Sequence, residues 1–213
     1  MRVPDAKRPV LIIFAKRPQV GRVKTRLGAT IGLTEAAGVY ARLLYGLLLR
    51  MLALRPQIEI RLCLASVDDM PFFQAAFPEL TVCAQCPGDI GQRMKASLHD
   101  ALASGAPKAI LIGSDAPDID AATIEQALAS LDGAPVVLGP ATDGGYYLVG
   151  AIAPLPDLFT GIPWSTQDVL SETIALADCQ GVEVSLLPEM SDIDTEKDLA
   201  AWQLELRQEN TDV

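Results

Sequence analysis

Hydrophobic residues along the chain fall into short continuous runs, separated by longer segments in which they recur with the period of a helix. Continuous runs of this length are typical of strands buried on both faces of a sheet. The runs predict strands at residues 9–15, 58–65, 80–84, 109–113, 135–138, 146–151 and 182–187. The first of them, PVLIIFA, contains no charged residue and predicts a buried strand.

The intervening segments predict helices at residues 35–54, 69–76, 89 or 91 to 104, 121–131, 167–179 and 195–207. Ser, Thr and Asp before a helix accept hydrogen bonds from its first N–H groups. The residues expected to cap these helices are Thr34, Asp118 or Asp120, Ser165 or Thr166, and Asp194. The alternation of strands and helices predicts an α/β fold in three layers, with a mainly parallel sheet covered by helices on both faces.

Length and composition narrow this picture to one globular domain over residues 1–213. Half of the residues are hydrophobic and 21% are charged, which excludes a disordered chain. Residues 36–54 form the most hydrophobic stretch, but Arg42, Gly46 and Arg50 interrupt it, so we expect a buried helix and no membrane span. The first hydrophobic run is too short for a signal peptide, so we expect a cytoplasmic protein whose four cysteines are free thiols.

Charge is distributed unevenly along the chain. The formal net charge of −10 argues against a nucleic-acid partner. Residues 1–30 nevertheless carry eight basic side chains against Asp5 alone, and the remaining residues carry a net −17. A basic segment on an acidic protein indicates a local anionic ligand.

Five of these basic residues lie in the loop after the first predicted strand, where ligands bind in open α/β sheets. They are Lys16, Arg17, Arg22, Lys24 and Arg26. Gly21 and Gly28 allow the backbone to approach a ligand, and the cations can meet phosphate oxygens. The loop is not a P-loop, because Val23 precedes Lys24 where that motif has glycine. We therefore predict a phosphate-binding loop; the alternative is a solvated basic loop.

Acidic residues follow other predicted strands. Asp115 comes after the buried run at 109–113 and, facing the basic loop, can hold Mg²⁺ or Mn²⁺ against phosphates. Asp192 or Asp143 is the candidate for a second metal ligand. No helix begins directly after Asp115, so a capping role does not explain it.

The segment from Asp143 to Tyr147 joins two predicted strands through two glycines. A turn alone accounts for Asp and Gly at these positions. Gly144, Gly145 and Tyr146 could also form an acceptor site, since glycine admits a substrate closely and tyrosine can stack on a sugar or a base. Trp164 is either a core residue or a platform for the acceptor.

Six motifs together resemble the nucleotide-diphospho-sugar transferase superfamily, which has a GT-A-like, Rossmann-like fold. In order along the chain they are GRVKTRL, GDIGQRM, IGSDAPDI, GPATDGGYYLVG, PWST and DIDTEKDL. They are most similar to a bacterial family usually described as glycosyltransferase-like, sometimes linked to arsenosugar or selenium gene neighbourhoods. That family is similar to the phospholactate and molybdenum-cofactor guanylyltransferases.

The resemblance implies roles for particular residues. Lys24 and Arg26 would contact nucleotide phosphates, and Asp115 would occupy the metal-binding position. Residues 88–93 would lie along the nucleotide. With the basic loop, the predicted nucleotide site comprises Ala15, Lys16, Gly21, Lys24, Arg26, Gly88 and Arg93.

Two reactions fit this set of residues. A nucleotidyltransferase would join an NTP to a small phosphorylated acceptor and release pyrophosphate, with Lys24 and Asp115 as the catalytic pair. The alternative is a glycosyltransferase that uses an NDP-sugar; a domain that binds nucleotides without catalysis is the third hypothesis. Five cations in one loop suit the larger charge of a triphosphate and favour the first. The oligomeric state, monomer or homodimer, stays open.

Overall fold

The computed structural model describes residues 7–154 and 157–209, and for 205–209 the backbone alone; Arg2 and Asp5 lie outside the described residues. Its strands are Val10–Ala15 (β1), Glu59–Leu64 (β2), Thr81–Ala84 (β3), Ala109–Ile112 (β4), Val136–Pro140 (β5), Tyr146–Ala151 (β6) and Val184–Leu186 (β7). They form one sheet in the order β3-β2-β1-β4-β6-β5-β7. Only β6 runs antiparallel to its neighbours among the described strands, so the predicted mainly parallel sheet is confirmed.

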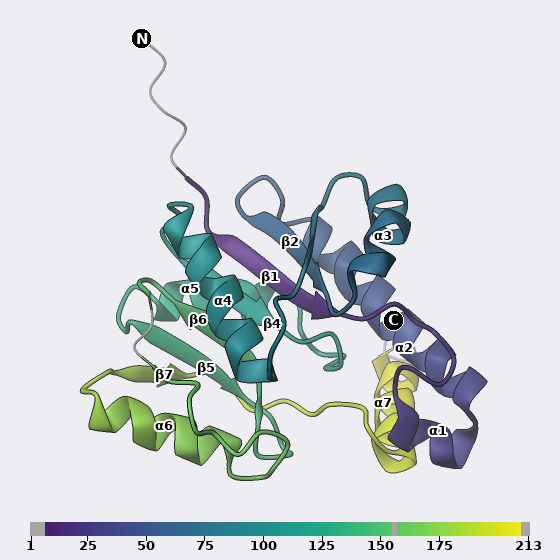
Figure 1. Cartoon of the computed structure of the whole chain (residues 1–213). Coiled ribbons are helices and arrows are strands. Elements are labelled where there is room, and N and C mark those ends of the chain that lie inside the picture. Colours follow the sequence, from purple (N-terminus) through teal and green to yellow (C-terminus); the bar gives the residue numbers. More distant parts are fainter. Residues whose placement is uncertain (1–6, 155–156, 210–213) are drawn as a thin grey trace.

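Helices pack on both faces of this sheet (Figure 1). They are Thr25–Ile31 (α1), Leu33–Leu52 (α2), Met70–Ala76 (α3), Ile90–Ala103 (α4), Ala121–Ser130 (α5), Val169–Cys179 (α6) and Glu196–Glu209 (α7), with a single 3₁₀ turn at Val67–Asp69 (η1). Side chains of α2, α3 and α5 cover one face, and those of α4 and α6 cover the other. The predicted three-layer architecture is therefore correct.

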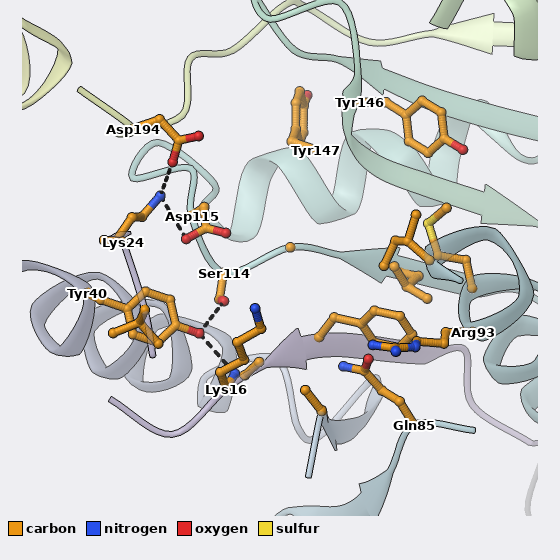
Figure 2. Close-up of a pocket in the computed structure, with 18 of the residues that line it drawn as sticks. Lys16, Lys24, Tyr40, Gln85, Arg93, Ser114, Asp115, Tyr146, Tyr147 and Asp194 are labelled. Carbon is orange, nitrogen blue, oxygen red and sulfur yellow. Dashed lines mark hydrogen bonds and ion pairs between the residues drawn. The ribbon is translucent and has the colours of Figure 1, made fainter. Parts of the chain in front are cut away.

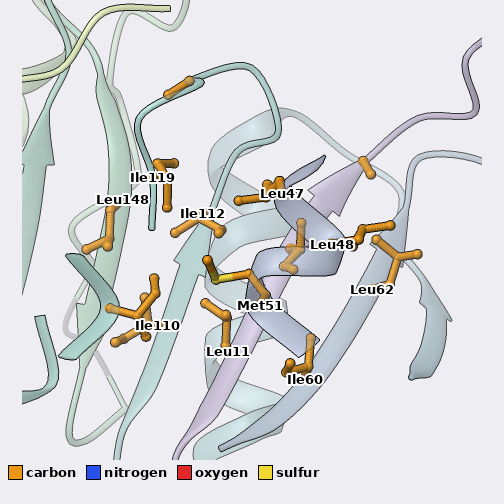
Figure 3. Close-up of a cluster of buried hydrophobic side chains, with 14 of the residues drawn as sticks. Leu11, Leu47, Leu48, Met51, Ile60, Leu62, Ile110, Ile112, Ile119 and Leu148 are labelled. Atoms are coloured by element: carbon orange, nitrogen blue, oxygen red, sulfur yellow. The ribbon is translucent and has the colours of Figure 1, made fainter. Parts of the chain in front are cut away.

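Strand β1 is hydrophobic at every position because helices cover both of its faces. Leu11 and Ile13 point to the α2 side of the sheet, whereas Val10, Ile12 and Phe14 point to the α4 side. All six of its residues are buried. Figure 3 shows Leu11 packed among side chains of α2 and of the neighbouring strands. The buried sheet holds the ends of its strands rigidly, and that rigidity positions the loops that follow them.

Helix α1 was missed, because its seven residues lie in the segment interpreted as a loop. It packs closely on α2 at Gly28, where an added Cβ atom would lie 2.8 Å from the Leu33 side chain and would force that side chain to shift. Since α1 runs directly into α2, the predicted cap at Thr34 is wrong. Gly32, with φ of 90°, separates the two helices, and Thr34 lies inside α2.

The other predicted caps give mixed results. Asp120 caps α5 as predicted, through a reciprocal pair of hydrogen bonds with Thr123. The caps proposed at Ser165 or Thr166 are wrong, because α6 begins only at Val169 and has no side-chain cap.

Asp194 does not cap α7 either, because its carboxylate accepts a hydrogen bond from Lys24. Thr195 takes the capping position instead. Its hydroxyl accepts a hydrogen bond from the backbone N–H of Asp198, and the Asp198 carboxylate accepts one from the backbone N–H of Thr195.

Cysteine pairing also differs from the expectation. Cys63 and Cys83 face each other on the parallel strands β2 and β3, with Cα atoms 4.7 Å apart, and form a disulfide. Cys86 and Cys179 are free. The spacing of the cysteines along the chain gives no sign of this pairing, which follows from strand register.

In the described part of the chain, no helix is long and hydrophobic enough to cross a membrane.

Candidate active site

A cavity of about 480 Å³ opens where β1 and β4 end (Figure 2). Its charged lining consists of Lys16, Arg22, Lys24, Arg26, Arg93, Asp115 and Asp194. The loop after β1 therefore does face the acidic end of β4, as parallel strand ends should. Arg17, the fifth cation of the predicted loop, lies over the Phe72 ring instead, and Arg93 of α4 supplies the fifth cation of the cavity. A cavity with five cations and two carboxylates suits a ligand with several negative charges.

Lys24 lies at the centre of these charges. Its Nζ atom is 2.9 Å from Asp115 Oδ1 and 2.8 Å from Asp194 Oδ1. Only 4% of the lysine side chain is exposed, whereas nearly half of each aspartate side chain is. Burial lowers the pKa of Lys24, but the charges and hydrogen bonds of Asp115 and Asp194 outweigh it, so the pKa is raised overall and the ammonium stays charged.

Backbone geometry fixes this arrangement. Lys24 has φ of 45° and ψ of 46°, a left-handed conformation that costs a residue with a Cβ about 1 to 2 kcal/mol. Helix α1 begins immediately after it. On the acidic side, the backbone N–H of Ile193 donates to the carbonyl of Asp115 at 3.4 Å, which ties the segment before α7 to the end of β4. Asp194 therefore reaches the same ammonium as Asp115.

Asp192 belongs to this electrostatic group although it does not line the cavity. Its pKa is raised to about 7, chiefly by burial and then by the charge of Asp115; Asp143 and Asp194 raise it further and Lys24 lowers it. A carboxyl group in this position holds its proton close to neutral pH.

Asp143 and the two glycines after it form the turn between β5 and β6. Asp143 Oδ1 accepts a hydrogen bond from the backbone N–H of Gly145 at 2.8 Å. Gly144 has φ of 89°, and a Cβ there would collide with the backbone of Gln167. None of the three lines the cavity, so the structure places them in the turn and not around the ligand space.

Tyr146 lines the cavity, but Trp164 does not. The two rings pack edge to face with centroids 6.4 Å apart. Trp164 also covers Gly91 at the start of α4, where a Cβ would lie 2.5 Å from the indole. Burial raises the pKa of Tyr146, opposed by the Thr173 hydroxyl. Trp164 therefore packs against the core and against the Tyr146 ring, outside the lining of the cavity.

The predicted nucleotide-binding residues divide in a similar way. Ala15 and Arg93 line the cavity with the basic residues, whereas Gly21 and Gly88 do not. Gly88 acts indirectly, because its carbonyl accepts a hydrogen bond from Arg93 Nε at 2.8 Å. Gln85, at the end of β3, was not predicted; its Nε2 donates to the carbonyl of Cys63 at 2.9 Å, and the side chain borders the cavity.

Tyr40 and Ser114 were also missed. The Tyr40 hydroxyl accepts a hydrogen bond from the backbone N–H of Lys16 at 3.0 Å and pairs with Ser114 Oγ at 2.9 Å. This link joins α2 to the ends of β1 and β4, and both side chains line the cavity. Tyr40 looks like any other buried position of a hydrophobic helix in the sequence, so no pattern identifies it.

The distribution of acids bears on metal binding. Among the described residues, no three Asp, Glu, His or Cys side chains gather closely enough to hold an ion by themselves. Asp115 and Asp194, however, each place an oxygen within 3 Å of one ammonium nitrogen, so the two carboxylates are spaced to share a single cation. Mg²⁺ is commonly held by one or two carboxylates together with substrate phosphates.

Comparison with known proteins places the chain in a family. The profile of a family described as an uncharacterized protein conserved in bacteria, DUF2064, matches residues 48–166, more than half of the chain. The chain belongs to the DUF2064 family. No curated protein matches this DUF2064 sequence.

Solved structures resemble the DUF2064 protein over most of its length. One, from Desulfovibrio desulfuricans G20 and provisionally assigned as a nucleotide-diphospho-sugar transferase, is 33% identical with a TM-score of 0.85, covering 91% of this chain and 85% of that one. A 4-diphosphocytidyl-2C-methyl-D-erythritol synthase from Anaerococcus prevotii DSM 20548 is 12% identical, with a TM-score of 0.59 and coverage of 95% and 100%. A CMP:2-keto-3-deoxy-manno-octonic acid synthetase solved with CTP is 14% identical, with a TM-score of 0.55 and the same coverage. The fold expected from the motifs is therefore confirmed.

Proposed function

We propose that this DUF2064 protein is a metal-dependent nucleotidyltransferase, which joins a nucleotide from an NTP to a small phosphorylated acceptor and releases pyrophosphate. One observation carries the proposal: five cations and a pair of carboxylates converge on one cavity at the ends of β1 and β4. The fold is shared with a CMP:2-keto-3-deoxy-manno-octonic acid synthetase solved with CTP and with a 4-diphosphocytidyl-2C-methyl-D-erythritol synthase. This likeness supports a reaction that uses a nucleotide. The cytoplasm, where NTPs are available, is the proposed location.

The cations have a direct use in this reaction. Phosphoryl and nucleotidyl transfer depend mainly on positioning and on fixed positive charge around the phosphates. Arg26, whose side chain is 79% exposed, and Lys16 can approach the triphosphate from the loop after β1. An NTP carries more negative charge than an NDP-sugar, whose terminal phosphate is esterified by the sugar. A group of five cations therefore favours the triphosphate.

A divalent ion fits the acidic side of the cavity. Asp115 and Asp194 would hold Mg²⁺ or Mn²⁺, since their oxygens are spaced to share one cation. Asp143 is a poor second ligand because its Oδ1 is used in the turn, and Asp192 is a poor one because it does not line the cavity and its raised pKa favours the protonated carboxyl. When bound, the ion neutralises charge that develops on the phosphate oxygens.

The acceptor requires less from the protein. A phosphate acceptor is already anionic at neutral pH, so no general base is assigned. Tyr146 and Tyr147 line the cavity on the side of β6, which makes this side the proposed acceptor region. The Tyr147 hydroxyl donates to the carbonyl of Pro188 at 3.1 Å, so its ring is fixed in place.

An Asp115→Asn variant tests the proposal. We expect it to lose roughly 10² to 10³-fold in turnover, as for the loss of one essential electrostatic group. Lys24→Ala should lose a similar amount. The matched control is Asp132→Asn, which breaks a comparable ion pair of 2.6 Å with Lys108 outside the cavity. Full activity of Asp115→Asn, with both proteins folded by circular dichroism, would remove Asp115 from the mechanism.

Glycosyl transfer from an NDP-sugar is the second candidate, favoured by the provisional assignment of the relative with 33% identity. The two reactions differ in what leaves. Incubation with each NTP or with NDP-sugars, Mg²⁺ and a panel of small phosphomonoesters should yield pyrophosphate from an NTP. Release of NDP from an NDP-sugar, without pyrophosphate from any NTP, would establish the second candidate instead.

A further inference from the structure

Lys24 occupies the position in which a cation between Asp115 and Asp194 would have to lie. Its ammonium contacts one oxygen of each carboxylate, at 2.9 Å and 2.8 Å. Distances of this size are those of charge-assisted hydrogen bonds, which are the strong ones. A divalent ion that binds both oxygens must therefore displace the ammonium.

The other cations of the cavity are arranged differently. Lys16 forms no ion pair among the described residues, and Arg26 makes only a longer contact of 3.7 Å with Asp194 while staying largely exposed. Lys24 alone of these is buried against both carboxylates. One ammonium leaves the two carboxylates with a net charge of −1. The pair therefore retains attraction for a doubly charged ion.

We propose that Lys24 is a built-in competitor for the divalent ion, so that ion and nucleotide bind this protein together and not separately. Without nucleotide, the ammonium holds the carboxylate pair and divalent ions bind weakly. When a polyphosphate enters, its oxygens offer the ammonium a new partner in the same cavity, and the carboxylates become available to the ion. The role of the polyphosphate rests on the proposed function, whereas the competition between ammonium and ion does not.

The test measures binding of Mn²⁺ to the full chain without nucleotide, by the loss of the free-ion signal in electron paramagnetic resonance. We expect Lys24→Met to bind Mn²⁺ at least roughly tenfold more tightly than wild type, because the ion no longer has to break two charge-assisted hydrogen bonds. Lys16→Met is the matched control: it removes the same charge from the same cavity but not from the carboxylate pair. We expect a change of less than about threefold in this control.

Equal Mn²⁺ affinity of wild type and Lys24→Met, or an equal gain in Lys16→Met, would overturn the proposal. Since removal of Lys24 leaves two carboxylates facing each other, the variant could fail to fold, so a second measurement uses wild type. The Lys24 ammonium, protected by its two partners, should give a ¹H–¹⁵N signal at low temperature that is missing in Lys24→Met or, if that variant does not fold, in Lys24→Arg. Saturating Mg²⁺ should shift or abolish this signal; an unchanged signal with Mg²⁺ bound would overturn the competition.

The outcomes for competition and for catalysis are distinguishable. Tighter Mn²⁺ binding by Lys24→Met with no pyrophosphate released by wild type supports the competition and contradicts the proposed function. Pyrophosphate release by wild type, with unchanged Mn²⁺ affinity in Lys24→Met, supports the proposed function and contradicts the competition.

Discussion

Replacement of Asp192 by Asn should remove a pH-dependent loss of stability. In the native protein the pKa of Asp192 is raised from 3.8 to about 7 by burial and by the charge of Asp115. Between these two pH values the native state holds a proton that the unfolded chain has lost, so the free energy of unfolding falls as pH rises. The full shift corresponds to about 4 kcal/mol, at 1.36 kcal/mol for each pKa unit.

Urea unfolding of wild type and Asp192→Asn at pH 4 and at pH 8 measures this effect. Asn is uncharged at both values, so we expect the variant to gain about 3 to 4 kcal/mol relative to wild type between pH 4 and pH 8. Asp132→Asn, which replaces a largely exposed aspartate outside the site, should show little such gain. If the difference between Asp192→Asn and wild type is the same at both pH values, Asp192 is not held protonated and the electrostatic account of the acidic group is wrong.

Three further substitutions are measured by urea unfolding; they test a hydrogen-bonded pair, a close contact and the disulfide. Tyr40→Phe removes a hydroxyl in the wall of the cavity and should cost about 1 to 3 kcal/mol, because the Lys16 N–H and the Ser114 hydroxyl lose their partner. No loss would mean that water replaces the hydroxyl. Gly91→Ala places a methyl group against Trp164 and should cost about 1 to 3 kcal/mol, whereas a gain would show that the indole moves freely. Cys63→Ala opens the bridge to Cys83, which spans 20 residues, and should cost about 3 kcal/mol without reductant. With dithiothreitol wild type should lose as much, and insensitivity to reductant would argue against the bridge.

The arrangement of layers could be predicted because a strand that is buried on both faces has a continuous run of hydrophobic residues. Every residue of β1 is hydrophobic since each packs against α2 or α4, and the order of strands and helices follows from such runs. Helix α1 could not be predicted in this way. Its seven residues include Gly28 and two polar positions at its start, and it depends on packing against α2, which the local sequence does not encode.

The site could be predicted in part, from the rule that ligands bind at the ends of parallel strands. That rule identified Asp115 and the basic loop that contains Lys24, and the resemblance of the motifs singled out Lys24 within this loop; the two side chains do meet. It failed for Asp194, because an aspartate before a helix looks like a cap whether or not its carboxylate is used elsewhere. Tyr40 was missed for a different reason: its contact with Ser114 joins positions 74 residues apart, and only the folded chain brings them together.

The identity of the leaving group decides whether this protein is a nucleotidyltransferase. The purified protein is incubated with each of the four NTPs, Mg²⁺ and a panel of small phosphomonoesters, and products are analysed by mass spectrometry and a pyrophosphate assay. We predict pyrophosphate together with a nucleotidylated acceptor, dependent on Mg²⁺ and lost in Asp115→Asn but not in Asp132→Asn. Pyrophosphate release that persists unchanged in Asp115→Asn, or release of NDP from an NDP-sugar alone, would contradict it.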